Sequence, residues 1–151
     1  MKAAIVFSSR TSNTSKVAEA IAAGLGEKGV EVVLKSLTTG VVDGDVASAD
    51  LLGLGSGIYG MNVDKKLLEF VALLPQADGR KVFLFSTSGR GKGQTGALRK
   101  AVQKKGYSVV AEFACKGLDK WGPLKFIGGV NKGHPDATDL ENARKFGASL
   151  A

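Results

Sequence analysis

Seven of the eight residues from Ser8 to Ser15 carry a hydroxyl or amide side chain, and the eighth, Arg10, adds a positive charge. This run joins a short apolar segment, residues 3–7, to an alanine-rich helical pattern that begins near Thr14. The first N–H groups of a helix have no partner within the helix, and the helix dipole favours negative charge there. The run is therefore a candidate phosphate-binding loop, although serine, threonine and asparagine are also common helix caps and turn residues.

Two further polar stretches that contain glycine follow apolar segments in the same way. Gly55–Gly60 follows the apolar residues 51–54 and contains one aromatic residue, Tyr59. Residues 86–93 follow the apolar residues 81–85. Because glycine has no side chain, backbone in such a loop can approach a ligand closely. Both stretches are therefore predicted to be ligand-contacting loops.

The elements that must position these loops alternate along the chain. Segments of strand length, rich in apolar and β-branched residues, occupy residues 2–7, 30–34, 51–54, 81–85 and 107–115. Apolar residues recur at helical spacing in residues 14–28, 64–74, 95–105 and 136–150. Residues 38–50 are predicted to be a loop with at most one short helix. This alternation predicts a doubly wound, five-stranded parallel sheet with helices on both faces, and the loops after Ser8, Ser56 and Ser86 then converge at one edge.

Length and composition predict one globular domain, residues 1–151. The chain has 44% hydrophobic and 23% charged residues, as ordinary soluble proteins have. A single cysteine, Cys115, excludes an internal disulfide and fits a reducing compartment. The apolar run near the start is too short for a signal-peptide core, and no run approaches transmembrane length. A cytoplasmic location is expected.

Charge is distributed unevenly along the chain. Residues 1–79 carry a net charge of −2, whereas residues 80–151 carry +9. A basic surface attracts acidic proteins, anionic small molecules, nucleic acid or anionic lipid, and charge alone does not choose among them. It is also compatible with a solvated surface that keeps the protein soluble.

The three loops together resemble those of the flavodoxin family. Residues 9–14, Ser-Arg-Thr-Ser-Asn-Thr, are similar to the family's phosphate loop, with Ser12 in place of its usual glycine. Residues 50–56 with Tyr59 resemble the second flavin-contacting loop, and residues 85–89 resemble the third. The resemblance spans the whole chain. Unlike typical flavodoxins, which are strongly acidic and often supply two aromatic residues to the ring, this chain is basic and has no aromatic residue in residues 86–93.

The resemblance implies a three-layer fold with strand order 2-1-3-4-5 and non-covalently bound FMN as the cofactor. It places the phosphate at residues 9–14 and the isoalloxazine ring between residues 56–60 and 87–90, with Tyr59 and Trp121 as the available ring-stacking aromatics. The implied FMN-binding residues are Ser9, Arg10, Thr11, Ser12, Asn13, Thr14, Ser56, Gly57, Ile58, Tyr59, Gly60, Thr87, Ser88, Gly89, Arg90 and Trp121.

This implies an electron carrier whose flavin performs the redox chemistry while the protein sets its potential and exposure. The expected partner is a redox protein with an acidic docking surface, and a small-molecule electron donor or acceptor is possible; no nucleic-acid partner is expected. The alternative is an FMN-dependent reductase or oxidase of the NAD(P)H/quinone type that acts on a small or anionic substrate. A flavin-free binding module that kept the fold is a third interpretation. No protein catalytic residue or metal site is predicted.

Three other features of the sequence bear on function. Gly91–Gly96 matches the dinucleotide-binding glycine pattern, with Glu112 near the position of its ribose-binding acid, but it does not follow its strand directly. Cys115 is expected to pack as a small apolar group. The chain has only one histidine, His134, so the sequence does not favour a histidine metal site or a Ser/His hydrolase. His134 is expected at the surface of a long loop, residues 116–135, which is functional or mobile.

Overall fold

The computed structural model describes residues 1–8, 13–37, 44–59, 62–88, 95–116 and 135–151. No helix in these residues is long and apolar enough to cross a membrane.

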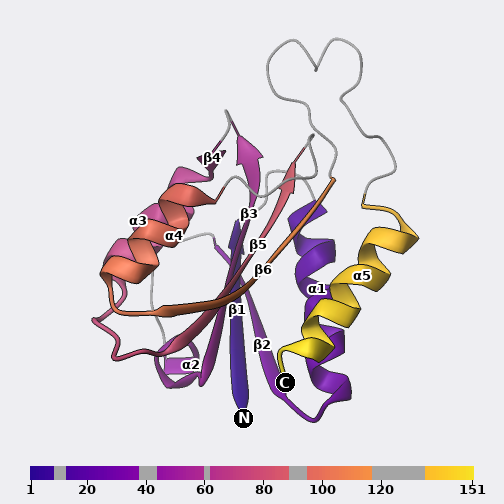
Figure 1. The fold of residues 1–151 in the computed structure, drawn as a ribbon, viewed down its shortest axis with the longest axis horizontal. Coiled ribbons are helices and arrows are strands. Elements are labelled where there is room, and N and C mark those ends of the chain that lie inside the picture. Colours follow the sequence, from indigo (N-terminus) through magenta and orange to yellow (C-terminus); the bar gives the residue numbers. More distant parts are fainter. Residues whose placement is uncertain (9–12, 38–43, 60–61, 89–94, 117–134) are drawn as a thin grey trace.

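A parallel sheet forms the middle layer of the protein (Figure 1). Its parallel strands are β1 (Lys2–Ser8), β2 (Glu31–Ser36), β3 (Leu51–Tyr59), β5 (Lys81–Ser88) and β6 (Ser108–Lys116). They lie in the order β2-β1-β3-β5-β6. Because β5 and β6 are the fourth and fifth parallel strands along the chain, this order confirms the predicted order 2-1-3-4-5. One short strand was not predicted: β4 (Asn62–Val63) pairs antiparallel with the end of β3.

Helices cover both faces of the sheet, as predicted (Figure 1). On one face lie α1 (Asn13–Glu27) and α5 (Ala137–Ser149). On the other lie α2 (Gly44–Ser48), α3 (Lys65–Leu73) and α4 (Gly96–Lys104). The helical patterns that predicted α1, α3, α4 and α5 place these helices correctly to within one or two residues at each end.

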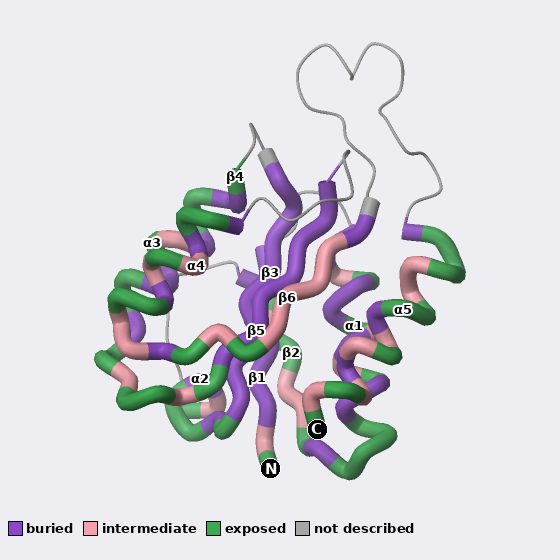
Figure 2. The backbone as a smooth tube through the Cα atoms, viewed as in Figure 1, coloured by how far each residue is buried: buried purple, intermediate pink, exposed green. Residues whose placement is uncertain are grey.

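Each face of the sheet packs its own core, because successive side chains of a strand point to opposite faces. In β5, Val82 and Leu84 join the core under α3 and α4, whereas Phe83 and Phe85 join the core under α1 and α5. Figure 2 shows the resulting burial along β3 and β5. This double burial explains why the strands read as apolar runs without polar alternation.

The described parts of two predicted loops prove to be the ends of strands. Residues 55–59 continue β3, and residues 86–88 continue β5. Glycine at positions 55 and 57 suggested a loop, but a Cβ atom at Gly55 would collide with the Phe85 ring on the neighbouring strand, just as one at Gly53, within the predicted strand, would collide with the Phe83 ring. These glycines are therefore packing positions inside a central strand. Cross-strand packing of this kind is not visible in the local sequence.

Helices α1 and α5 approach closely through two glycines. A Cβ atom at Gly24 would collide with the Arg144 carbonyl, and one at Gly147 would collide with the Ile21 carbonyl. We expect Gly147→Ala to lower the free energy of unfolding by about 1–3 kcal/mol, because the two backbones must separate. Chemical denaturation measures this change. Gly26→Ala, in the same helix pair but with open space around it, should be neutral or stabilising by up to about 1 kcal/mol; equal effects would contradict this account.

Candidate functional site

The carboxyl ends of β1, β3 and β5 meet in register at one edge of the sheet. Ser8 lies opposite Ser56, and Ser56 lies opposite Ser86. One residue further on, Gly57 lies opposite Thr87. The predicted convergence of the three chain segments is therefore confirmed for the part of each that the structure describes. The polar side chains therefore gather at the carboxyl ends of the strands, which is where doubly wound parallel sheets bind their ligands.

On the α3 side of this edge, Asp64 ties two strand ends together. The Ser8 hydroxyl donates a 2.6 Å hydrogen bond to the Asp64 carboxylate, and the Asp64 N–H donates a 2.9 Å bond to the Ser56 hydroxyl. The Ser56 hydroxyl in turn donates to the Gly57 carbonyl at 2.6 Å. Asp64 is only 5% exposed. This buried network, which we call the Asp64 clamp, fixes β1 and β3 relative to each other.

The Asp64 clamp also sets the start of α3. The Asp64 carboxylate accepts a 3.0 Å hydrogen bond from the Lys66 N–H, so Asp64 is the N-cap of this helix. The sequence carries this signal, since an aspartate directly precedes an amphipathic helical pattern. It does not reveal that the same carboxylate reaches Ser8, 56 residues earlier in the chain. Asp64 is a residue of this edge that sequence reasoning missed.

On the α1 side of the edge, a second contact joins two of the predicted FMN-binding residues. The Thr14 and Thr87 hydroxyl oxygens lie 3.1 Å apart and share a hydrogen bond. Thr14 belongs to the first turn of α1, and both side chains are buried. No acidic residue occupies this first turn, so nothing there opposes the helix dipole's preference for an anion. The first turn of α1 is thereby anchored to the end of β5.

Ser86 lies opposite Ser56 and directly before Thr87 on β5, and its hydroxyl is unusual. The side chain is fully buried, and its oxygen has no hydrogen-bond partner within the described part of the chain. An unsatisfied buried hydroxyl costs free energy, so such groups in native proteins usually have a water, ligand or structural explanation. The edge therefore retains hydrogen-bonding capacity that the described residues do not use.

Eight of the predicted FMN-binding residues have described positions. The backbone of Tyr59 ends β3, and the other seven, described with their side chains, are Asn13, Thr14, Ser56, Gly57, Ile58, Thr87 and Ser88. All of them lie at this edge, on α1, β3 or β5. The remaining predicted residues lie outside the described residues: Ser9, Arg10, Thr11, Ser12, Gly60, Gly89, Arg90 and Trp121. His134 also lies outside them.

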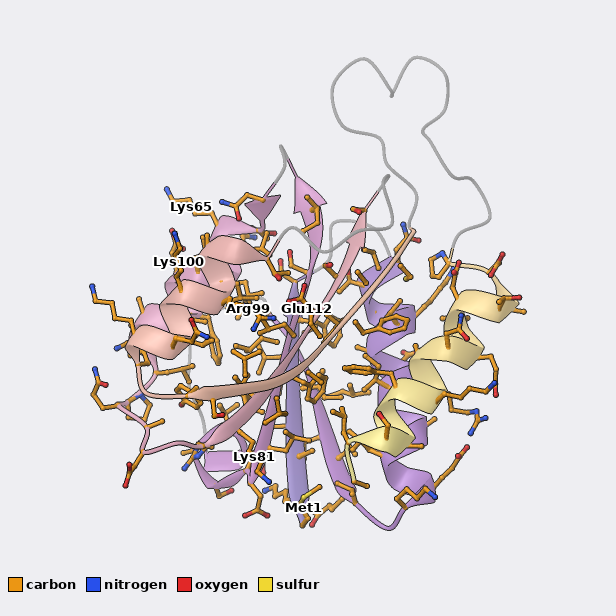
Figure 3. The ribbon with its side chains drawn as sticks, in the orientation of Figure 1. Met1, Lys65, Lys81, Arg99, Lys100 and Glu112 are labelled. Atoms are coloured by element: carbon orange, nitrogen blue, oxygen red, sulfur yellow. The ribbon has the colours of Figure 1, made fainter. Side chains whose placement is uncertain are left out.

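The acid of the rival dinucleotide pattern has internal partners. The Glu112 carboxylate accepts a 2.6 Å hydrogen bond from the Thr95 hydroxyl and a 2.8 Å ion-pair contact from Arg99. Figure 3 shows Arg99 and Glu112 directed toward each other between α4 and β6. Both oxygens of the Glu112 carboxylate therefore hold α4 against the edge strand β6. A dinucleotide-binding site would need this carboxylate to be free to bind a ribose, so the contacts argue against such a site here.

Cys115 packs as expected, as a small buried group near the end of β6, with 7% of its surface exposed. Burial raises the pKa of its thiol to about 12, and the nearby carboxylates of Asp139 and Asp136 act in the same direction. A thiol with so high a pKa forms almost no thiolate at neutral pH, so it is a poor nucleophile.

The sequence pattern of the flavodoxin domain matches residues 4–119, which include the three strand ends and the first turn of α1. The chain belongs to the flavodoxin family. A relative at 32% identity is the uncharacterized protein MJ0298 of Methanocaldococcus jannaschii, and the alignment covers 99% of this chain and 98% of the relative.

Solved structures agree with this flavodoxin assignment at the level of the fold. Oxidised flavodoxin 1 from Bacillus cereus superposes with a TM-score of 0.72 at 20% identity, over 99% of this chain and 97% of that one. The flavodiiron protein from Giardia intestinalis superposes with a TM-score of 0.70 at 17% identity, over 99% of this chain but only 35% of that one. The fold therefore occurs both as a chain of this size and as part of a longer protein.

Proposed function

We propose that this flavodoxin-family protein binds FMN at the carboxyl edge of its sheet and transfers electrons between redox partners. The observation that carries the proposal is the contact between Thr14 and Thr87, which joins the first turn of α1 to the end of β5. It brings the predicted phosphate-binding segment and a predicted ring-binding strand end together at one edge. Membership of the flavodoxin family supports FMN as the ligand.

The residues at this edge suit the two chemically different parts of FMN. Hydroxyl and amide groups at the start of a helix whose first turn contains no acidic residue match a phosphate. We assign this role to Asn13 and Thr14, with Ser9, Thr11 and the adjoining Arg10 and Ser12 as further proposed contacts. The unpartnered Ser86 hydroxyl shows that the edge holds hydrogen-bonding capacity beyond what its own fold uses.

The flat ring requires close backbone approach and an aromatic cover. Gly57 at the end of β3 lies opposite Thr87, so backbone of two adjacent strands is available there. We propose that Gly57, Gly60 and Gly89 admit the ring, that Ile58, Ser88 and Arg90 border it, and that Tyr59 and Trp121 shield it from water. Ser56 contributes by position, since its hydroxyl is already committed to the Asp64 clamp. When bound, FMN supplies the capacity to accept and return electrons.

The direct test is the absorption spectrum of the purified protein. We expect a flavin spectrum, release of FMN on denaturation, and rebinding of added FMN by the apo protein with a defined stoichiometry. A chain that neither contains nor binds FMN would contradict the proposal. Steady turnover of NAD(P)H with a small acceptor, without any protein partner, would instead favour the reductase or oxidase alternative.

A further inference from the structure

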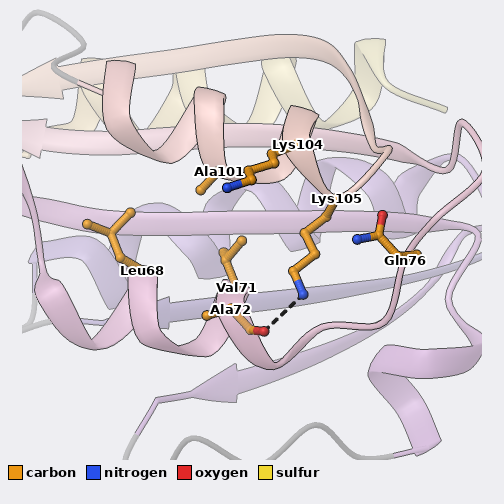
Figure 4. Close-up of a pocket in the computed structure, with 7 residues that line it drawn as sticks. All are labelled: Leu68, Val71, Ala72, Gln76, Ala101, Lys104 and Lys105. Carbon is orange, nitrogen blue, oxygen red and sulfur yellow. Dashed lines mark hydrogen bonds between the residues drawn. The ribbon is translucent and has the colours of Figure 1, made fainter.

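A cavity of about 370 Å³ opens between α3 and α4, away from the edge described above (Figure 4). Its apolar lining comes from Leu68, Val71 and Ala72 of α3 and Ala101 of α4. Its polar lining comes from Gln76, Lys104 and Lys105. We call this cavity the α3–α4 groove. It is an apolar depression between two surface helices, with cations at one end.

The groove has a fixed shape because Lys105 connects the two helices. Its ammonium group donates hydrogen bonds to the carbonyl oxygens of Ala72 at 3.0 Å and Leu74 at 2.9 Å, at the end of α3. Lys105 therefore satisfies carbonyls that the helix itself leaves without partners. Lys104, by contrast, is exposed, and no carboxylate pairs with it in the described part of the chain. Lys104 is thus the cation that the groove offers to a ligand.

The helices around the groove are strongly basic. Helix α4 contains no acidic residue, and α3 contains only Glu69. The basic residues of the two helices are Lys65, Lys66, Arg99, Lys100 and Lys104, and a further lysine, Lys105, directly follows α4. Arg99 is paired with Glu112, whereas Figure 3 shows Lys65 and Lys100 projecting outward from neighbouring helices. The surface around the apolar groove is therefore complementary to an acidic ligand.

Its size favours a protein segment over a free small molecule. Small-molecule sites usually span about 300–1,000 Å³, so the groove lies near the lower limit. Its charge, however, extends well beyond the cavity onto Lys65 and Lys100. A partner that inserts one large apolar side chain and surrounds it with carboxylates would use both features, in the manner of an interface anchor with a polar rim.

We propose that the α3–α4 groove docks an acidic segment of a partner protein, which inserts an apolar side chain between the helices. The groove itself is independent of flavin binding, whereas the identity of the occupant as an electron-transfer partner rests on the proposed function. Leu68, the groove residue nearest the start of α3, lies four residues beyond Asp64, about 6 Å along the helix axis, and the groove extends from there toward Gln76, beyond the end of α3. A docked partner would therefore lie along the face formed by α3 and α4 rather than over the proposed cofactor edge.

The test uses a short fluorescein-labelled peptide with one central phenylalanine flanked by glutamates, and its binding is followed by fluorescence anisotropy. Ala72→Glu places a negative charge in the groove at an exposed position of α3, and we expect it to weaken binding by about tenfold or more. Lys104→Glu should weaken binding about fivefold at low salt, and less at high salt. Circular dichroism and thermal melts check that both variants fold.

Two matched controls separate docking from general attraction. Lys28→Glu makes the same charge change at an exposed position beyond α1, and it should change the peptide affinity by less than about twofold. A peptide with serine in place of the phenylalanine should bind about tenfold more weakly to the unmodified protein. Equal effects of Lys28→Glu and Lys104→Glu, or equal affinities of the two peptides, would overturn the proposal.

Measurements on apo and FMN-loaded protein distinguish the two proposals. If the peptide binds as expected but no FMN binds, the docking groove stands and the proposed function fails. If FMN binds but peptide binding is insensitive to Ala72→Glu and Lys104→Glu, the docking proposal fails alone.

Discussion

Replacing Asp64 with alanine should lower the free energy of unfolding by about 1.5–5 kcal/mol, a large fraction of the stability of a typical domain. Two losses add. The α3 N-cap is removed, which costs about 0.5–2 kcal/mol, and the buried Ser8 hydroxyl loses its acceptor, which costs about 1–3 kcal/mol. Urea denaturation followed by circular dichroism measures the sum.

Two other variants separate these contributions. Asp136→Ala removes an N-cap from α5, but this aspartate is exposed whereas Asp64 is buried, so it should cost only about 1 kcal/mol. Asp64→Asn keeps one acceptor oxygen, enough for the Ser8 hydroxyl or for the Lys66 N–H but not for both, so only part of the stability should return. Equal losses for Asp64→Ala and Asp136→Ala would mean that the buried hydrogen bond to Ser8 contributes nothing measurable.

The sequence predicted those parts of the fold that depend on local patterns. The apolar residues of α1, α3, α4 and α5 recur at helical spacing, and the strands between them are apolar runs, so element type and order followed directly. The parallel arrangement then required the three strand ends to meet at one edge. The alignment of Ser8, Ser56 and Ser86 at one edge confirms this convergence, whereas the strand order, also confirmed, followed from the family resemblance.

Features that depend on contacts distant in sequence escaped prediction. Gly55 was assigned to a loop because the reason for a glycine there, the Phe85 ring of the adjacent strand, lies about thirty residues away in the sequence. The Asp64 clamp and the short strand β4 were not predicted for the same reason, since only the folded sheet brings Asp64 to Ser8. The pairing of Thr14 with Thr87 likewise joins two segments that the sequence placed at one edge without specifying a contact.

The other large effect concerns FMN affinity and rests on the proposed function. Replacing Thr11 and Thr14 together with alanine should weaken FMN binding by about 3–6 kcal/mol, since each hydrogen bond to a charged group contributes about 1.5–3 kcal/mol. That loss corresponds to a factor of about 10² to 10⁴ in the dissociation constant. Riboflavin, which lacks the phosphate, should bind the variant and the unmodified protein almost equally. Titration of the apo protein, followed by quenching of flavin fluorescence, measures both ligands.

The hydrogen bond between Thr14 and Thr87 requires its own control, because removing Thr14 also frees its partner. Thr87→Val removes the same internal bond while leaving the Thr14 hydroxyl in place. If that bond only orders the edge, Thr87→Val should weaken the binding of FMN and the binding of riboflavin by the same modest factor. A loss specific to FMN in the double alanine variant, but absent from Thr87→Val, therefore identifies a phosphate contact. Equal losses of FMN and riboflavin in the double variant would place the phosphate away from the first turn of α1.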